Sequence, residues 1–316
     1  MTFYILKRSL GAVLVMWAVA TLVFFMLRLL PGDPLAAMMF DAGDPAAADV
    51  LRTKYGLDQP VYVQYWRWFT LMLQGDLGAS IYGSRVPVSQ ILMEAAPRTL
   101  SLAFLSFVVA VVIAIPAGLL SALRRGRPVD HGVTFVAFVG LSMPDFWLGI
   151  LLILLFAANL GWLPAIGYQP MSEGFWTWLS HLLMPAIAAG TAFSAIIARM
   201  VRSSMLEVLK TDYVRVAYAK GLRPKQVVMG HAFPNALIPV ITVMGIAFGL
   251  LMASTVVVET VFAIKGLGRI LIEGILNRDY PVVQGAILAV SFIFVFVNLL
   301  VDILYGVIDP RIRVQG

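Results

Sequence analysis

The sequence predicts an all-α polytopic membrane protein with six transmembrane helices. Of its 316 residues, 60% are hydrophobic and only 13% are charged, and the mean hydropathy is +0.90. Soluble domains carry about a quarter charged residues, so this chain could not cover itself with an ordinary solvated surface. The apolar residues fall in long blocks, whereas an outer-membrane β-barrel would show segments of about ten residues with alternating polarity. The predicted class is therefore helical and membrane-embedded.

Six apolar segments are long enough to cross a bilayer, which takes about 20 residues in a helix. They lie at residues 9–27, 99–123, 133–160, 182–198, 236–258 and 282–307. The first segment follows Lys7 and Arg8 and could be taken for a signal peptide. Its apolar run is longer than a signal-peptide core, and no small-x-small cleavage site precedes the run Pro-Gly-Asp-Pro at 31–34. We therefore expect a retained first helix.

The distribution of Lys and Arg between the spans predicts that both termini face the cytoplasm. Fourteen of these residues flank the span ends on the side of the termini, and eight lie on the opposite side. Cytoplasmic flanks are enriched in Lys and Arg, although five of the eight lie in a loop long enough for this bias to weaken. The net charge of +6 thus reflects membrane topology, and we expect contact with the lipid bilayer and no nucleic-acid binding.

The predicted external loop at 31–97 contains an aromatic-rich stretch at 61–73 that is too short to span a membrane. Two interpretations stay open. The stretch could form a helix at the outer, periplasmic membrane surface, with its Trp and Tyr rings at the level of the headgroups. It could equally form a helix packed against the transmembrane bundle.

The loop at 204–234, between the fourth and fifth spans, bears most directly on function. Thr211 or Asp212 can cap a helix N-terminus, and Gly221 can supply the left-handed residue that ends the helix. The enclosed helix is only about ten residues long, so we expect it to need packing from outside itself. Tyr213, Ala217 and Gly221 recur every four residues, which places a bulky side chain and two small positions on one face.

Basic residues surround this predicted helix, at Arg215, Lys220, Arg223 and Lys225. A short, basic, glycine-terminated helix suits docking to a soluble protein, because small residues let a partner approach closely. An ordinary positive-inside loop that happens to be helical fits the same pattern. Local physical chemistry leaves both alternatives open.

This loop resembles the conserved cytoplasmic loop of binding-protein-dependent ABC importer permeases. The family pattern is Glu-Ala-Ala, three residues, Gly, nine residues, and then Ile-x-Leu-Pro. Ala217, Gly221 and Pro234 stand at matching positions, whereas His231 and Phe233 replace Ile and Leu. Arg215 replaces the opening Glu, so any role of that carboxylate does not carry over.

The form of residues 212–222, DYVRVAYAKGL, is nearer the peptide/nickel branch of these permeases, although Tyr218 departs from the basic residue common there. The resemblance runs from end to end of the chain with the right spacing. It includes RLLPGDP (28–34), YGLDQP (55–60), GDLG (75–78), SMPDFW (142–147), GLGR (266–269), RDYPVVQG (278–285) and DPRIR (309–313).

The resemblance implies the type I ABC importer permease fold and the role of a transmembrane subunit in a bacterial inner membrane. It implies three kinds of partner: a second homologous permease subunit, two cytoplasmic P-loop ATPase subunits and a periplasmic substrate-binding protein. Peptides are the implied substrates, with glutathione or a nickel complex as alternatives. It also implies ATPase coupling through Asp212, Tyr213, Ala217, Ala219, Lys220, Gly221, Leu222 and Pro234.

No phosphate-binding loop of the form Gly-x-x-x-x-Gly-Lys-Ser/Thr occurs in the sequence. We therefore expect no enzymatic activity and no bound cofactor in this chain, with ATP and Mg²⁺ used by the partner ATPases. The chain has no Cys, and its three His residues are far apart, so we expect no metal site.

Two rival classes fit less well. An ion-coupled secondary transporter would favour an internal repeat, and none is evident. A membrane enzyme would need clustered nucleophiles, carboxylates or metal ligands, which the sequence does not show.

Polar residues inside the spans are candidates for the translocation pathway or its gate, because a charge at the bilayer centre costs at least about 2.5–3.5 kcal/mol. Asp145 lies near the middle of the third span, beside Ser142 and Pro144. These three residues could line the pathway or form a packed helix kink. Glu259, near the outer end of the fifth span, could serve as a gate or binding-protein contact, or reach toward the membrane boundary.

Overall fold

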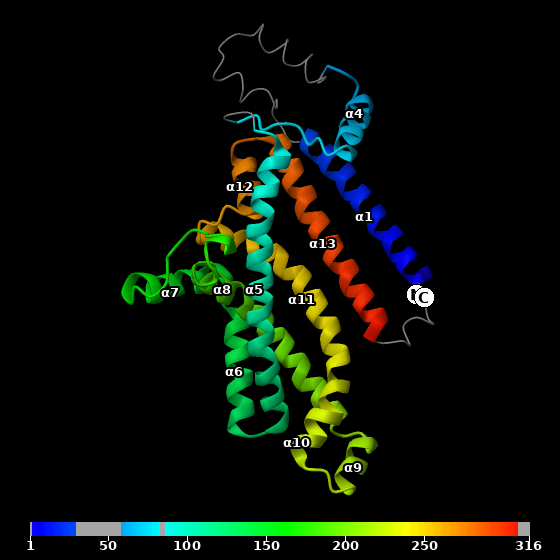
Figure 1. Cartoon of the computed structure of the whole chain (residues 1–316), viewed down its shortest axis with the longest axis vertical. Helices are drawn as coiled ribbons and strands as arrows, with labels where there is room; N and C mark the ends of the chain where they lie inside the picture. The colour runs from blue at the N-terminus through cyan, green and yellow to red at the C-terminus, as the bar shows by residue number, and fades with distance from the viewer. Residues whose placement is uncertain (1, 30–57, 83–85, 309–316) are drawn as a thin grey trace. The chain divides into compact units, whose positions relative to one another are not determined.

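The computed structural model describes residues 2–29, 58–82 and 86–308 (Figure 1). Within these ranges the secondary structure is helical, and the one β contact is an isolated bridge between Ala79 and Pro87. The long helices are α1 (Thr2–Leu29), α5 (Val88–Leu123), α8 (Phe175–Val208), α11 (Phe233–Val261) and α13 (Tyr280–Ile308). The shorter helices are α4 (Val61–Leu73), α6 (Pro128–Ser142), α7 (Asp145–Leu152), η1 (Ile153–Asn159), η2 (Met171–Glu173), α9 (Asp212–Ala219), α10 (Pro224–Val227), η3 (Val228–Ala232) and α12 (Leu267–Leu276).

Five of the described helical stretches are long and apolar enough to cross a bilayer. They are Leu6–Arg28, Val88–Leu123, Phe175–Val208, Pro224–Val261 and Tyr280–Val301. A sixth span is obtained if the broken pair Pro128–Ser142 and Asp145–Asn159 counts as one. The predicted all-helical membrane fold is confirmed, and the predicted six spans match the count that includes the broken pair. The cytoplasmic location of the termini stays a prediction.

The third predicted span, 133–160, is not one straight helix. Its two halves are bent by 101° at a break between Ser142 and Asp145. Met143 has φ −85° and ψ 125°, and Pro144 follows with φ −62° and ψ 137°. A proline disfavours helical geometry in the residue before it and has no N–H to donate, so the helix ends here.

The chain forms two compact units. One comprises the described residues of Met1–Ser9, Leu100–Ile264 and Phe296–Gly316, and the other those of Leu10–Thr99 and Lys265–Val295. The expectation of one permease domain over residues 1–316 stays a prediction.

In the first unit, α8 packs against α6, α7 and α11. Its contact with the part of α5 in the same unit depends on glycine. A Cβ atom on Gly118 would lie 2.5 Å from the carbonyl oxygen of Ala198, and one on Gly190 would lie 2.6 Å from that of Ser106. Small residues of this kind let membrane helices approach at backbone distance.

In the second unit, α4 packs on α1. The hydroxyl groups of Tyr65 and Thr21 lie 2.8 Å apart, and Tyr65 is buried. Arg28 lies over the ring of Phe24 at 3.4 Å and donates to the side-chain oxygen of Gln64 at 2.9 Å. These contacts show the packing that was one of the two interpretations of this stretch, and its location at the membrane surface stays a prediction.

The other core of the second unit is apolar and joins α12 to the parts of α5 and α13 that belong to it. Its buried residues are Val88, Leu92, Ala95, Leu267, Val282 and Ala286. Asp279, which is buried, accepts hydrogen bonds from the hydroxyl of Ser80 and from the backbone N–H of Ile81. This carboxylate ties the segment before α5 to the start of α13.

Candidate functional site

The connection between α8 and α11, residues 209–232, lies at one end of these two helices and contains α9 and α10 (Figure 1). Helix α9 begins after Thr211, whose backbone is extended, with φ −72° and ψ 153°. The Thr211 side chain does not cap the helix as predicted, because its hydroxyl donates to the carbonyl of Val208 at 2.6 Å. Asp212 stands in the first turn, where its negative charge interacts favourably with the helix dipole.

The end of α9 follows the sequence prediction. Gly221 has φ +80°, in the left-handed region, and its N–H donates to the carbonyl of Tyr218 at 2.9 Å. No heavy atom lies within 4 Å of the place where a Cβ would stand on Gly221. The glycine is therefore required by its backbone conformation and not by crowding.

Helix α9 has a buried face and an open face. Val214 and Ala217 are buried, and α9 packs against α10, where Val227 is also buried. The spacing placed Ala217 on one face with Tyr213 and Gly221, and in the structure Ala217 is buried while Tyr213 is exposed. Positions 214 and 217 are three residues apart and therefore lie on the same side of the helix. Burial of the larger Val214 side chain where α9 packs on α10 therefore buries Ala217 as well.

The open face combines apolar and basic side chains. Tyr213 is 44% exposed and Val216 is 51% exposed. Arg215 is exposed and pairs with Asp212 at 3.2 Å, an exposed contact that contributes little stability. Lys220 is exposed as well. A patch that is both apolar and positively charged fits a partner groove with an apolar floor and an acidic rim.

The other predicted coupling residues lie on both sides of this patch. Ala219 is exposed in the last turn of α9, and Leu222 is partly buried just after Gly221. Pro234 is exposed at the start of α11. The connection is mostly exposed, and its buried residues are Val214, Ala217, Val227, Val228 and Ala232.

Three of the pathway candidates meet at the break between α6 and α7. Ser142 ends α6 and donates to the carbonyl of Phe138 at 2.9 Å, and Pro144 precedes α7. Asp145 is the first residue of α7 and is partly buried, beside the hydroxyl of Ser254 in α11. This is the kinked arrangement that was one of the two interpretations of these residues.

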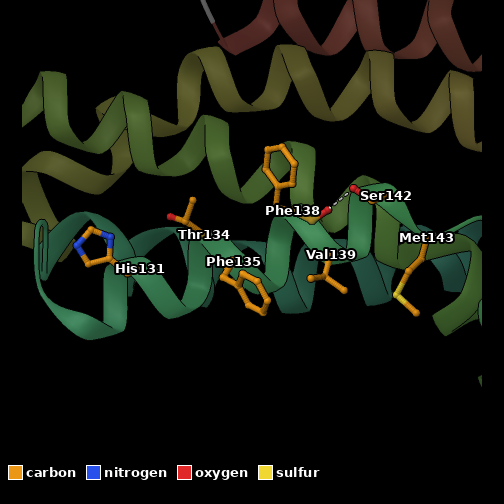
Figure 2. A pocket seen from close by; sticks show the side chains of 7 residues that line it. All are labelled: His131, Thr134, Phe135, Phe138, Val139, Ser142 and Met143. Carbon is orange, nitrogen blue, oxygen red and sulfur yellow. Dashed lines mark hydrogen bonds between the residues drawn. The ribbon is translucent and has the colours of Figure 1, made fainter.

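A shallow groove of about 450 Å³ runs along α6 to this break (Figure 2). Ser142 lines it, and Pro144 and Asp145 do not. Its other lining residues are His131, Thr134, Phe135, Phe138, Val139 and Met143. Glu259 is separate from the groove and fully buried in α11, which argues against a side chain that reaches toward the membrane boundary.

Sequence reasoning missed a partly buried ion pair near the start of this connection. Arg202 of α8 donates from Nε and Nη2 to the two carboxylate oxygens of Asp130 in α6, at 2.8 and 2.9 Å. The two residues are 72 positions apart, and each looks like an ordinary flanking charge in the sequence.

Among the described residues, no group of three or more His, Cys, Asp or Glu side chains could hold a metal ion.

Comparison with known families decides the identity. Residues 114–314 match the model of the binding-protein-dependent transport system inner membrane component, and residues 1–103 match the N-terminal model of the same kind of protein. The chain belongs to this family. It is therefore a permease, the membrane-embedded component of such a transport system, and the resemblance seen in its loop and motifs is confirmed.

Relatives of this permease span its full length. A putative peptide transport system permease from Brucella abortus is 45% identical over 99% of each chain. The oligopeptide transport permease AppB of Bacillus subtilis is 40% identical, covering 99% of this chain and 100% of its own. The glutathione transport permease GsiC of Salmonella paratyphi A is 42% identical over 98% of each chain.

The fold of the permease is that of a solved importer. A chain of the MetNI methionine ABC transporter in an inward-facing conformation superimposes with a TM-score of 0.58 at 21% identity. The match covers 70% of this chain and 97% of that chain. The predicted importer permease fold is thereby confirmed.

Proposed function

We propose that this permease is one of two transmembrane subunits of an ATP-driven importer and that α9 docks it to a partner ATPase. The observation that carries the proposal is the open face of α9, where Tyr213 and Val216 are exposed beside Arg215 and Lys220. Val214 and Ala217 fix the same helix to its own chain. A partner that covers the open face therefore does not have to order the helix first.

The remaining partners follow from the family. Its description includes a binding protein, and the chain has no phosphate-binding loop of its own. We infer a second homologous permease, two P-loop ATPases that use ATP and Mg²⁺, and a periplasmic substrate-binding protein. The complex belongs in the bacterial inner membrane, with the α8–α11 connection in the cytoplasm.

The mechanism we propose is alternating access with α9 as the coupling element. Closure of the ATPase pair on ATP displaces α9, and α8 and α11 carry this displacement because both continue directly into the connection. The pathway then opens outward and receives the ligand of the binding protein. ATP hydrolysis returns the complex to its inward-facing state.

Peptides are the substrates that the relatives favour. Two of the relatives described above are named for peptide or oligopeptide transport, and the third for glutathione, which is itself a small peptide. Uptake of a labelled dipeptide, a labelled oligopeptide and labelled glutathione by membrane vesicles containing the complex and its binding protein separates these cases. If none of these peptides is taken up and a chelated nickel complex is, the nickel complex replaces peptides as the proposed substrate.

We place the pathway at the break between α6 and α7, with Ser142, Pro144 and Asp145, and we keep Glu259 as a gate candidate. The partly buried carboxylate of Asp145 beside Ser254 supports this placement, because an ionisable residue within a membrane-spanning segment is costly and is by default a candidate functional residue.

Cross-linking tests the docking proposal directly, since the chain has no Cys of its own. Val216→Cys carries a thiol on the open face of α9, and Ile275→Cys provides a matched control because Ile275 is similarly exposed, at 56% against 51%, but lies in α12. Each variant is labelled with a photoactivated maleimide before the ATPases are added, and the assembled complex is then irradiated. We expect a cross-link to an ATPase from the first variant only, and its absence there would contradict the proposal.

A further inference from the structure

Asp130 lies at the centre of a buried cluster in the first unit. Its side chain is 3% exposed, and its two oxygens accept four hydrogen bonds. The donors are the hydroxyl of Ser121 in α5, the N–H of Gly126 in the turn after α5, and two N–H groups of Arg202 in α8. A carboxylate offers about four lone-pair sites, so the acceptor capacity of Asp130 is used completely.

The contact between Asp130 and Arg202 is rigid for a side-chain contact. Nε and Nη2 of Arg202 donate to different oxygens of Asp130, at 2.8 and 2.9 Å, so the guanidinium and the carboxylate are joined by two parallel hydrogen bonds. Such a bidentate pair fixes the relative orientation of the two side chains as well as their distance. Ser121 and Gly126 each donate to one of the same two oxygens, which leaves the carboxylate of Asp130 little freedom to turn.

The two residues stand where a displacement of the α8–α11 connection would first reach the rest of the unit. Arg202 is six residues before the end of α8, which is about 9 Å along a helix. Two residues beyond it, the hydroxyl of Ser204 donates to the carbonyl of Ala236 at 2.8 Å and ties α8 to α11. Asp130 is in the first turn of α6, and the other end of α6 is the break before Pro144.

We infer that the Asp130–Arg202 pair is a positioning contact that passes movement of α8 to α6 and so to the break between α6 and α7. This inference rests on the proposed docking of α9. The bond between Ser204 and Ala236 moves α8 together with α11, and the bidentate pair adds α6 to the moving group. Without the pair, α8 and α6 would stay in packing contact but would lose the contact that fixes their relative orientation at this end of α6.

The informative variant is Arg202→Lys. Lysine keeps the positive charge and can reach one carboxylate oxygen, but it cannot make the parallel two-bond contact. Ser121→Ala is the matched control, because it removes a bond to the same carboxylate from the α5 side and leaves the contact with α8 intact. A purely structural role of the cluster predicts similar effects of the two changes, whereas a role in transmission predicts an effect of Arg202→Lys alone.

The reporter of movement is a thiol at the break. Both changes are made in a Ser142→Cys background, and the thiol labelling rate is compared between the nucleotide-free complex and the complex trapped with ATP and vanadate. With Arg202 in place we expect trapping to change the rate by about fivefold or more, the lower end of typical coupling between sites. Ser121→Ala should keep this change, and Arg202→Lys should reduce it to less than about twofold.

Co-purification of the ATPases and the thermal unfolding temperature show whether each variant is assembled and folded. The ratio of ATP hydrolysed to labelled dipeptide taken up should rise in Arg202→Lys. Should Arg202→Lys unfold, Asp130→Glu, which keeps the charge and displaces the carboxylate by one methylene, takes its place. An unchanged labelling response in Arg202→Lys or Asp130→Glu, or no response with Arg202 in place, overturns the inference. Loss of the Val216→Cys cross-link would instead refute the docking of α9, independently of these results.

Discussion

Replacing Gly221 by alanine should loosen α9 without disturbing the rest of the chain. Gly221 has φ +80°, and left-handed geometry costs a residue with a Cβ about 1–2 kcal/mol. No heavy atom lies within 4 Å of the added Cβ, so crowding contributes nothing. A cost of this size raises the population of the opened segment by about 5- to 30-fold. Amide hydrogen exchange over residues 212–219 measures this change, because the protection factors should fall by the same factor as the opened population rises.

Gly230→Ala is the control for this prediction. Gly230 belongs to the same connection and also has open space around its Cβ position, but it has no left-handed φ. Its replacement should leave exchange over residues 212–219 unchanged. Gly221→Asn should fall between the two, because asparagine adopts left-handed geometry more readily than alanine. Equal protection in all three variants would refute the assignment of the cost to the backbone of Gly221.

Three further perturbations test the packing of α8 on α5, the Asp130–Arg202 ion pair and the open face of α9. Gly190→Ala should destabilise the chain by about 1–3 kcal/mol in thermal unfolding, because its Cβ would lie 2.6 Å from a backbone oxygen of α5. Gly132→Ala should leave stability unchanged, because no heavy atom lies within 4 Å of the added Cβ. Equal unfolding temperatures of the two variants would count against the close contact between α8 and α5. Asp130→Ala should cost about 3 kcal/mol, the lower end for a broken buried pair, because the Arg202 side chain is 32% exposed. A loss below about 1 kcal/mol in denaturant unfolding would show that water replaces the carboxylate. Val216→Asp should leave unfolding unchanged and abolish recovery of the ATPases, and normal recovery would exclude α9 as their docking site.

The helices could be predicted from the sequence because a bilayer imposes length and polarity on each span. The five long apolar stretches stand where hydropathy places them, and the end of α9 at Gly221 follows from a local backbone requirement. These features depend on neighbouring residues only. The long helices extend beyond their apolar cores, as α8 does at both ends of 182–198, because helical hydrogen bonds continue past the edge of the apolar run.

The features that the sequence did not predict all depend on distant residues. The proline at 144 predicts a break in the third span, but the angle of 101° is set by what α6 and α7 each pack against. Ala217 and Gly221 share a helical face by spacing, and only the packing of α10 shows that Ala217 is buried and Gly221 open. The partners Asp130 and Arg202 have no local signal at all, because charged residues near span ends are ordinary topology signals.

The division of α9 into a buried and an open face explains how so short a helix could transmit force. An eight-residue helix is unstable alone in water, because nucleation costs more than so few hydrogen bonds return. Burial of Val214 and Ala217 against the chain supplies the missing stability and makes α9 part of the body formed with α10. A partner that pushes on Tyr213 and Val216 therefore displaces this body as a unit instead of unwinding the helix. The same reasoning explains why Gly221, which has no neighbour to contact, is essential to the segment: it lets the chain leave α9 and turn into α10 within four residues.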